Sequence, residues 1–83
     1  METEWIKIGE QRLKISDIVR YKPDVYTRMI RDDENGGFKS EIMNYEMIVC
    51  YRDGSLVYSE HEPFISKEER DERLKQLDDI FLK

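Results

Sequence analysis

The chain has 83 residues, which is the size of a single domain. Charged residues make up 40% of it, but three Phe, five Tyr and one Trp give it more to bury than disordered chains have. No apolar run approaches the roughly 20 residues of a membrane-spanning helix, and the N-terminus is acidic where a signal peptide is basic. The only cysteine, Cys50, excludes an internal disulfide. We therefore expect one cytoplasmic domain over residues 1–83, without cofactor or metal.

The net charge of −5 is unevenly distributed. Residues 1–31 hold seven bases and five acids, a net charge of +2, whereas residues 32–83 hold seven bases and fourteen acids, a net charge of −7. Most such charge is ordinary solvated surface. The alternative interpretation is a dipolar molecule that steers a charged partner.

The first predicted element is a hairpin. Two alternating segments flank Gly9-Glu10, and a glycine at the first of two central positions suits a type II′ turn. Pairing across this turn sets Ile6 opposite Leu13 on an apolar face. The other face is basic and aromatic, and it carries Trp5, Lys7, Arg12 and Lys14.

Two further strands are predicted before residue 32. Pro23 has no amide hydrogen, so it either ends a strand that begins near Val19 or places that strand at a sheet edge. A second strand is expected over residues 25–31. The polar stretch 32–37 contains Asn35-Gly36-Gly37, which predicts a hairpin loop.

Residues 38–52 form the longest extended segment. Alternation puts the odd-numbered residues from 43 to 51 on one face and the even-numbered residues from 42 to 50 on the other. Asp53-Gly54 is typical of a type I′ turn. With that pair at the centre, the predicted register sets Tyr51 opposite Leu56 and Val49 opposite Tyr58.

A C-terminal helix is expected to begin at Ser66, because Ser66 and Glu69 match a capping box. The spacing predicts Glu69–Arg73 as a favourable pair along the helix. The apolar stripe occupies only the second half, so the helix should dock by Leu74, Leu77, Ile80 and Phe81.

The predicted fold is α+β, an antiparallel β-meander of four to five strands with one helix packed on one face. This layout of short strands, an Asp-Gly hairpin and a capped helix resembles several groups of small proteins, including the pleckstrin-homology-like bacterial domains and short flagellar regulators. No residue motif chooses among them, so the resemblance implies only the layout.

The sequence indicates no catalytic site. A cysteine nucleophile needs a nearby base, and the predicted register separates His61 from Cys50 by four residues, or roughly 13 Å. In Glu60-His61-Glu62 the histidine points away from both neighbours, so the three cannot share an ion. The stretch 32–37 lacks the ligand spacing of a calcium loop. No phosphate-binding glycine motif is present. We therefore expect a protein that is not an enzyme.

The chain has more aromatic side chains than one covered sheet face needs, which indicates an exposed binding surface. One helix cannot cover both faces of the sheet, and exposed tyrosine is typical of protein interfaces. We expect a non-enzymatic protein–protein interaction module, a small accessory, adaptor or inhibitor of phage or mobile-element type, with a second copy of the chain as one candidate partner. The alternatives are single-stranded nucleic-acid binding by the basic hairpin, or acidic mimicry of nucleic acid. The predicted partner-binding residues are Trp5, Lys7, Arg12, Lys14, Tyr26 and Tyr45.

Overall fold

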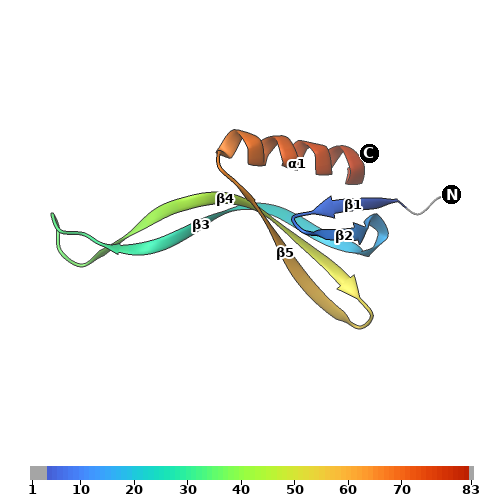
Figure 1. Cartoon of the computed structure of the whole chain (residues 1–83), viewed down its shortest axis with the longest axis horizontal. Helices are drawn as coiled ribbons and strands as arrows, with labels where there is room; N and C mark the ends of the chain where they lie inside the picture. Colours follow the sequence, from blue (N-terminus) through green and yellow to red (C-terminus); the bar gives the residue numbers. More distant parts are fainter. Residues whose placement is uncertain (1–3, 83) are drawn as a thin grey trace.

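Five antiparallel strands and one helix make up the computed structural model, which describes residues 4–82 (Figure 1). The elements in chain order are β1 (Trp5–Ile8), β2 (Gln11–Lys14), the 3-10 turn η1 (Ile15–Asp17), β3 (Ile18–Arg31), β4 (Phe38–Asp53), β5 (Leu56–Phe64) and α1 (Lys67–Phe81). β1 and β2 form a hairpin, and β3, β4 and β5 form a meander in that order. The predicted α+β meander with a C-terminal helix is confirmed.

The β1–β2 hairpin has the predicted register. Ile6 pairs with Leu13 and Trp5 with Lys14. Gly9 has a φ of 57°, as the first position of a type II′ turn requires. Ile8 and Leu13 are buried, so the apolar side of this hairpin faces the core.

Helix α1 and the β1–β2 hairpin cover the same face of the meander. The core consists of Ile8 and Leu13 from the hairpin, Met47 and Val49 from β4, and Leu77 from α1. Leu74 and Phe81 pack against this core, whereas Ile80 is exposed. The helix therefore docks by its second half as predicted, with one residue fewer in the stripe.

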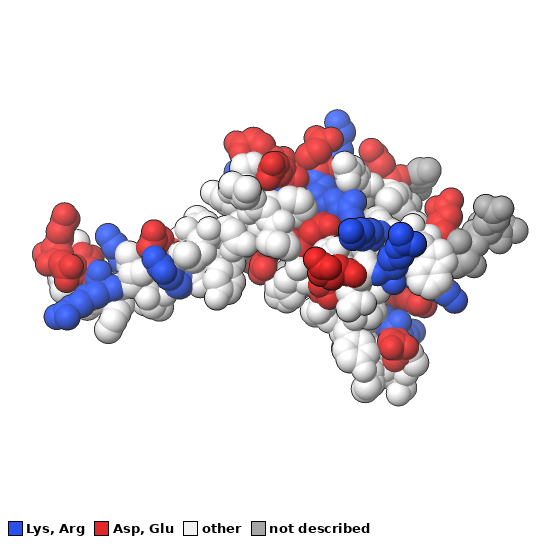
Figure 2. Space-filling model, viewed as in Figure 1, with Lys and Arg blue, Asp and Glu red and all other residues white. Residues whose placement is uncertain are grey.

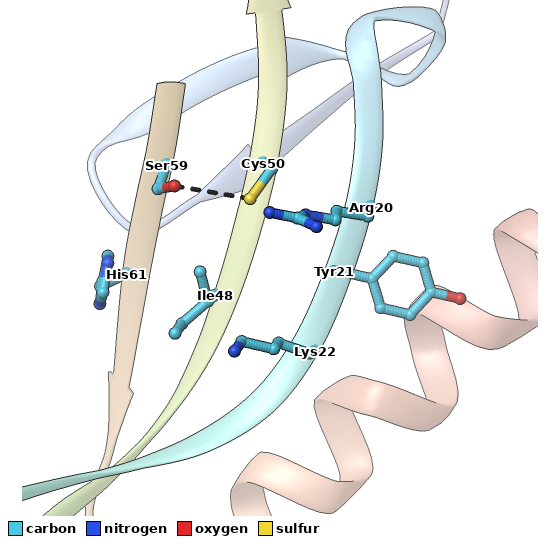
Figure 3. Close-up of a pocket in the computed structure, with 7 residues that line it drawn as sticks. All are labelled: Arg20, Tyr21, Lys22, Ile48, Cys50, Ser59 and His61. Carbon is cyan, nitrogen blue, oxygen red and sulfur yellow. Dashed lines mark hydrogen bonds between the residues drawn. The ribbon is translucent and has the colours of Figure 1, made fainter. Parts of the chain in front are cut away.

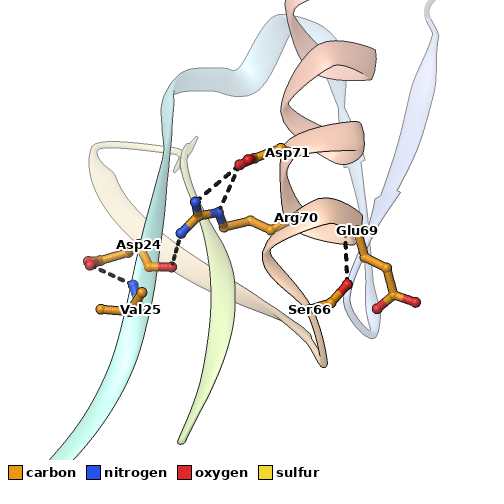
Figure 4. Close-up of polar contacts among 6 residues, drawn as sticks. All are labelled: Asp24, Val25, Ser66, Glu69, Arg70 and Asp71. Carbon is orange, nitrogen blue, oxygen red and sulfur yellow. Dashed lines mark hydrogen bonds and ion pairs between the residues drawn. The ribbon is translucent and has the colours of Figure 1, made fainter. Parts of the chain in front are cut away.

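Polar contacts attach the first half of α1 (Figure 4). The Ser66 hydroxyl accepts a hydrogen bond from the Glu69 amide at 3.2 Å, which confirms the predicted cap. Arg70 donates to the backbone carbonyl of Asp24 on β3 at 3.0 Å. Arg73 pairs with Glu62 on β5 at 2.9 Å, so the predicted Glu69–Arg73 pair is wrong. The sheet offers Arg73 a partly buried carboxylate, where a pair is screened less than on the helix surface.

Asp78 lies in the last turn of α1, where a carboxylate opposes the helix dipole. Its side chain accepts a 2.7 Å hydrogen bond from the hydroxyl of Tyr21 on β3. Burial, this hydrogen bond and the Asp78 charge together raise the pKa of Tyr21 to about 12. The hydrogen bond to Tyr21, which attaches the helix to the sheet, therefore explains a carboxylate at this otherwise unfavourable position.

Residues 18–31 form one strand rather than two, and Pro23 lies within it. β3 is an edge strand, and an edge is where a sheet tolerates the missing amide hydrogen of proline. Of the two predictions for Pro23, that it ends a strand or lies in an edge strand, the second is confirmed.

The predicted register of the β4–β5 hairpin is wrong. Tyr51 pairs with Tyr58 and Val49 with Glu60, so the strands are offset by two residues from the prediction. A type I′ turn needs positive φ at both central residues, but only Gly54 has it, with a φ of 65°. The turn is thus centred on Gly54-Ser55, with glycine first, as in the β1–β2 hairpin. An offset of two leaves every side chain on its predicted face.

A β-bulge interrupts the β3–β4 pairing between Tyr26 and Thr27. Tyr26 pairs with Asn44 and Thr27 with Ile42, so Met43 is the extra residue. The bulge reverses the alternation of β4, and the even-numbered residues beyond it share the face that holds Val49. The predicted assignment of Ile42 to the opposite face is therefore wrong.

Candidate interaction surfaces

The hairpin beyond the bulge projects from the rest of the molecule (Figure 1). We call residues 26–43 the arm and the remaining described residues the body. The molecule measures 59 × 29 × 20 Å, and its radius of gyration is 16.1 Å. A compact domain of 83 residues has a radius of gyration of about 12 Å.

The arm exists because β4 is much longer than the helix that covers it. Sixteen strand residues span about 54 Å, whereas fifteen helical residues span about 22 Å. The solvent-accessible surface is 6602 Å², against about 5,300 Å² for a compact monomer of 10.1 kDa. The excess of about 1,300 Å² is larger than the roughly 800 Å² that one partner contributes to a protein interface of standard size.

One face of the arm carries three uncovered apolar side chains, which alternate with Thr27, Ser40 and Arg31. By pairing and alternation, Met29, Phe38 and Ile42 share the face that is continuous with the core of the body. Their exposed fractions are 66%, 72% and 52%. Acidic and basic side chains of the arm gather toward its tip in Figure 2, beyond a stretch of uncharged surface next to the body. These three residues are not among the predicted binding residues, although the excess of strand length over helix length was a signal for them.

The loop at the tip of the arm is organised by Asp32. Its carboxylate accepts hydrogen bonds from the amides of Glu34 and Asn35 and from the Asn35 side chain. These bonds lower the pKa of Asp32, with the bonds from Asn35 contributing most. The Asp32 carboxylate thus stabilises the hairpin loop that the sequence predicted over residues 32–37.

The basic-aromatic face of the β1–β2 hairpin is exposed as expected. Trp5, Lys7, Arg12 and Lys14 all point away from the core. The Lys14 ammonium lies 5.6 Å from the Trp5 ring centre, which is the geometry of a cation–π contact. One face of the indole is therefore already occupied within the chain.

Tyr26 and Tyr45 do not join that surface. Tyr26 lies at the base of the arm and is exposed, on the sheet face opposite the core. Tyr45 pairs with Val25 on the core side, and the Arg70 guanidinium lies 5.3 Å from its ring centre. The six predicted binding residues therefore form one cluster of four and two separate positions.

The other bases of the N-terminal third are also separated from the hairpin cluster. Arg20 and Lys22 pair with Cys50 and Ile48, so their side chains lie on the sheet face opposite α1. Arg28 lies on the arm, where it pairs with Glu41 at 3.7 Å. Alternation along β3 puts Arg20 and Lys22 on the open sheet face, and the length of β3 carries Arg28 out onto the arm.

Cys50 and His61 lie closer together than the sequence predicted. His61 pairs with Ile48, which is two residues from Cys50 rather than four, because the β4–β5 register differs. The histidine Nδ1 nevertheless lies 3.2 Å from a Glu46 carboxylate oxygen, and the Cys50 sulfur lies 3.4 Å from the Ser59 hydroxyl. Each group thus has a partner other than the one a Cys–His nucleophile requires.

His61 also points to the opposite sheet face from Glu60 and Glu62, as expected from strand alternation. Glu62 instead binds Arg73 and the Gly9 amide. Within residues 4–82, no three acidic, histidine or cysteine side chains are grouped to hold a metal ion. The one helix of this range is too short and too polar to cross a membrane.

The chain matches no protein-family model, no curated protein and no solved structure.

Proposed function

We propose that this chain is a non-enzymatic protein-binding module and that it docks onto its partner by the arm. The observation that carries the proposal is the uncovered apolar face formed by Met29, Phe38 and Ile42. Monomers rarely expose contiguous apolar patches beyond a few hundred Å² unless the patch binds something. The arm also places this face away from the body, where a partner can reach it from several sides.

The proposal covers accessory, adaptor and inhibitor roles, all of which need only a binding face. A two-stranded hairpin is marginally stable alone, so a partner that covers the apolar face would also order the arm. The Arg28–Glu41 pair lies on the opposite face of the arm, and an exposed pair contributes little, so affinity is expected to come from the apolar side chains.

A photo-crosslinking amino acid tests the docking face. Benzoylphenylalanine is introduced in place of Phe38 on the arm and, as a matched control, in place of Leu56 at the β4–β5 tip. Leu56 is also a large apolar residue in a strand near a hairpin turn, and it is 58% exposed. Irradiation is carried out in the native host cells and on the purified chain.

We expect a discrete covalent product from position 38 and none from position 56. A product at twice the mass of the chain identifies a second copy as the partner, and a product of another mass identifies a different protein. Equal labelling at both positions, or no product from position 38, would overturn docking by the arm.

A further inference from the structure

The sheet face opposite α1 contains a hollow that no helix covers (Figure 3). Its volume is about 310 Å³, near the lower end of small-ligand sites. All three strands of the meander contribute to it. Its side chains on this face are Arg20 and Lys22 from β3, Ile48 and Cys50 from β4, and Ser59 and His61 from β5.

The two cations in this hollow have no ion-pair partner within residues 4–82. Neither Arg20 nor Lys22 forms an ion pair there, whereas Arg28, Arg31, Arg70 and Arg73 each do. Two carboxylates face the same side of the sheet: Glu46 is bonded to His61, and Asp24, two residues beyond Lys22 on β3, accepts a hydrogen bond from the Val25 amide. Figure 3 shows both cationic side chains extending from β3 toward β4.

The surroundings of Cys50 lower the pKa of its thiol. A hydrogen bond with Ser59 lowers the pKa of the Cys50 thiol most, and the Arg20 guanidinium and the Lys22 charge lower it further. Both cations of the hollow thus lie close enough to act on the thiol of Cys50, which is itself a buried residue.

We propose that this hollow binds a phosphate group, either as inorganic phosphate or as the monoester of a small molecule. A phosphate monoester carries a charge of about −1.5 to −2 at neutral pH, which matches two cations better than a monovalent carboxylate does. Arg20 supplies a planar set of donors and Lys22 a point charge, and the Ser59 hydroxyl is a further donor. Ile48 provides an apolar floor for the carbon atoms of an ester.

The test is an NMR titration of the full chain at constant ionic strength. Inorganic phosphate, glycerol 3-phosphate and acetate are added separately, with chloride adjusted to compensate. We expect saturable shifts of the Cys50, Ser59 and His61 signals with one or both phosphate compounds. The stronger of the two identifies the free ion or the ester as the ligand.

Two charge-matched variants control for general ionic effects. Arg20→Gln with Lys22→Gln removes both cations of the hollow, and Arg28→Gln with Lys39→Gln removes two from the arm. The first variant should bind phosphate about tenfold or more weakly, because charge-assisted hydrogen bonds are lost, and the second should bind like the wild type. Equal loss in both variants, or equal saturation by acetate, would overturn the proposal.

Alkylation of Cys50 by iodoacetamide gives an independent measurement. Bound phosphate should slow the reaction severalfold, since it covers the thiol and its charge disfavours the thiolate. Acetate at the same ionic strength should have no effect. Alkylation at an unchanged rate in saturating phosphate would contradict binding in this hollow.

Discussion

The body and the arm are built from the same two strands, yet they bury very different amounts of side chain. In the body, β3 and β4 are covered by α1 and by the β1–β2 hairpin, and Met47 and Val49 are fully buried. In the arm the two strands stay paired from the bulge down to Arg31 and Phe38, but no other element of the described residues packs on them. Phe38, the largest apolar residue there, is 72% exposed.

This contrast separates two contributions to a β-structure. Backbone pairing continues wherever two strands run side by side, whereas the free energy of apolar burial requires a second layer. The buried apolar residues of the body are accounted for by the stability of the fold. Met29, Phe38 and Ile42 of the arm are not, and they share one face, which is why the arm is the proposed docking face.

The largest expected effect is at the centre of the body. Leu77 is fully buried among Ile8, Met47 and Val49, so Leu77→Ala should lower the free energy of unfolding by about 2–5 kcal/mol. Met29→Ala in the arm should change it by less than about 0.5 kcal/mol. Urea unfolding of the two variants measures the contrast. Similar losses in both would show that the arm is part of the cooperative core.

The Tyr21–Asp78 hydrogen bond gives a smaller effect that depends on pH. Tyr21→Phe should cost about 1 kcal/mol near neutral pH, because Asp78 loses its donor. The pKa of Tyr21 is raised from 10.0 to about 12, so the folded state favours the neutral phenol. Its stabilisation is complete below pH 10 and is lost as the pH rises through 12.

The stability difference between the wild type and Tyr21→Phe should therefore narrow above pH 10 in chemical denaturation. Tyr26→Phe serves as the control, because Tyr26 is an exposed residue of the same strand. A difference that stays constant from pH 8 to 12 would mean that the Asp78 contact does not hold the phenol proton.

Arg70 lies at the boundary between the two regions. Its guanidinium binds the Asp24 carbonyl and stacks on Tyr45, immediately before the arm begins. Arg70→Ala should accelerate amide hydrogen exchange in residues 25–31 more than in residues 18–22. Arg70→Lys, which keeps the charge but loses the planar fork, should show most of the same effect. Uniform acceleration along β3 would contradict a local role.

The smallest effect on folding is expected for the arm face itself. Met29→Ser with Phe38→Ser should leave the urea midpoint nearly unchanged, since both side chains are already in water. In a pull-down with the purified chain as bait, the same variant should fail to retain the partner that the crosslink at position 38 identifies. As the control, Leu56→Ser with Val57→Ser changes two tip residues that are each 58% exposed. If the control loses the partner equally, the arm is not the specific surface.

Local signals predicted the elements well, because their causes lie within a few residues. The Ser66 cap, the glycine-first turn at Gly9 and the alternation of β4 near the core all appear as expected. The β4–β5 register was missed because Asp53-Gly54 matches one turn type while the chain adopts another. The predicted binding residues stay a prediction. Four of the six predicted binding residues cluster, but the hollow between Arg20 and His61 depends on three strands paired in a particular register.

By itself, the sequence determined the fold class, the order of the elements and which side chains of the first hairpin face the core. Those features follow from turn chemistry, capping and hydrophobic period, which act over short distances. Only the tertiary structure decided where the bulge reverses β4, how far α1 reaches along the sheet, and which bases meet on the open face. These depend on contacts between residues far apart in the chain, such as Arg70 with Asp24 and Tyr21 with Asp78. No local pattern specifies such contacts, because several registers satisfy the same alternation.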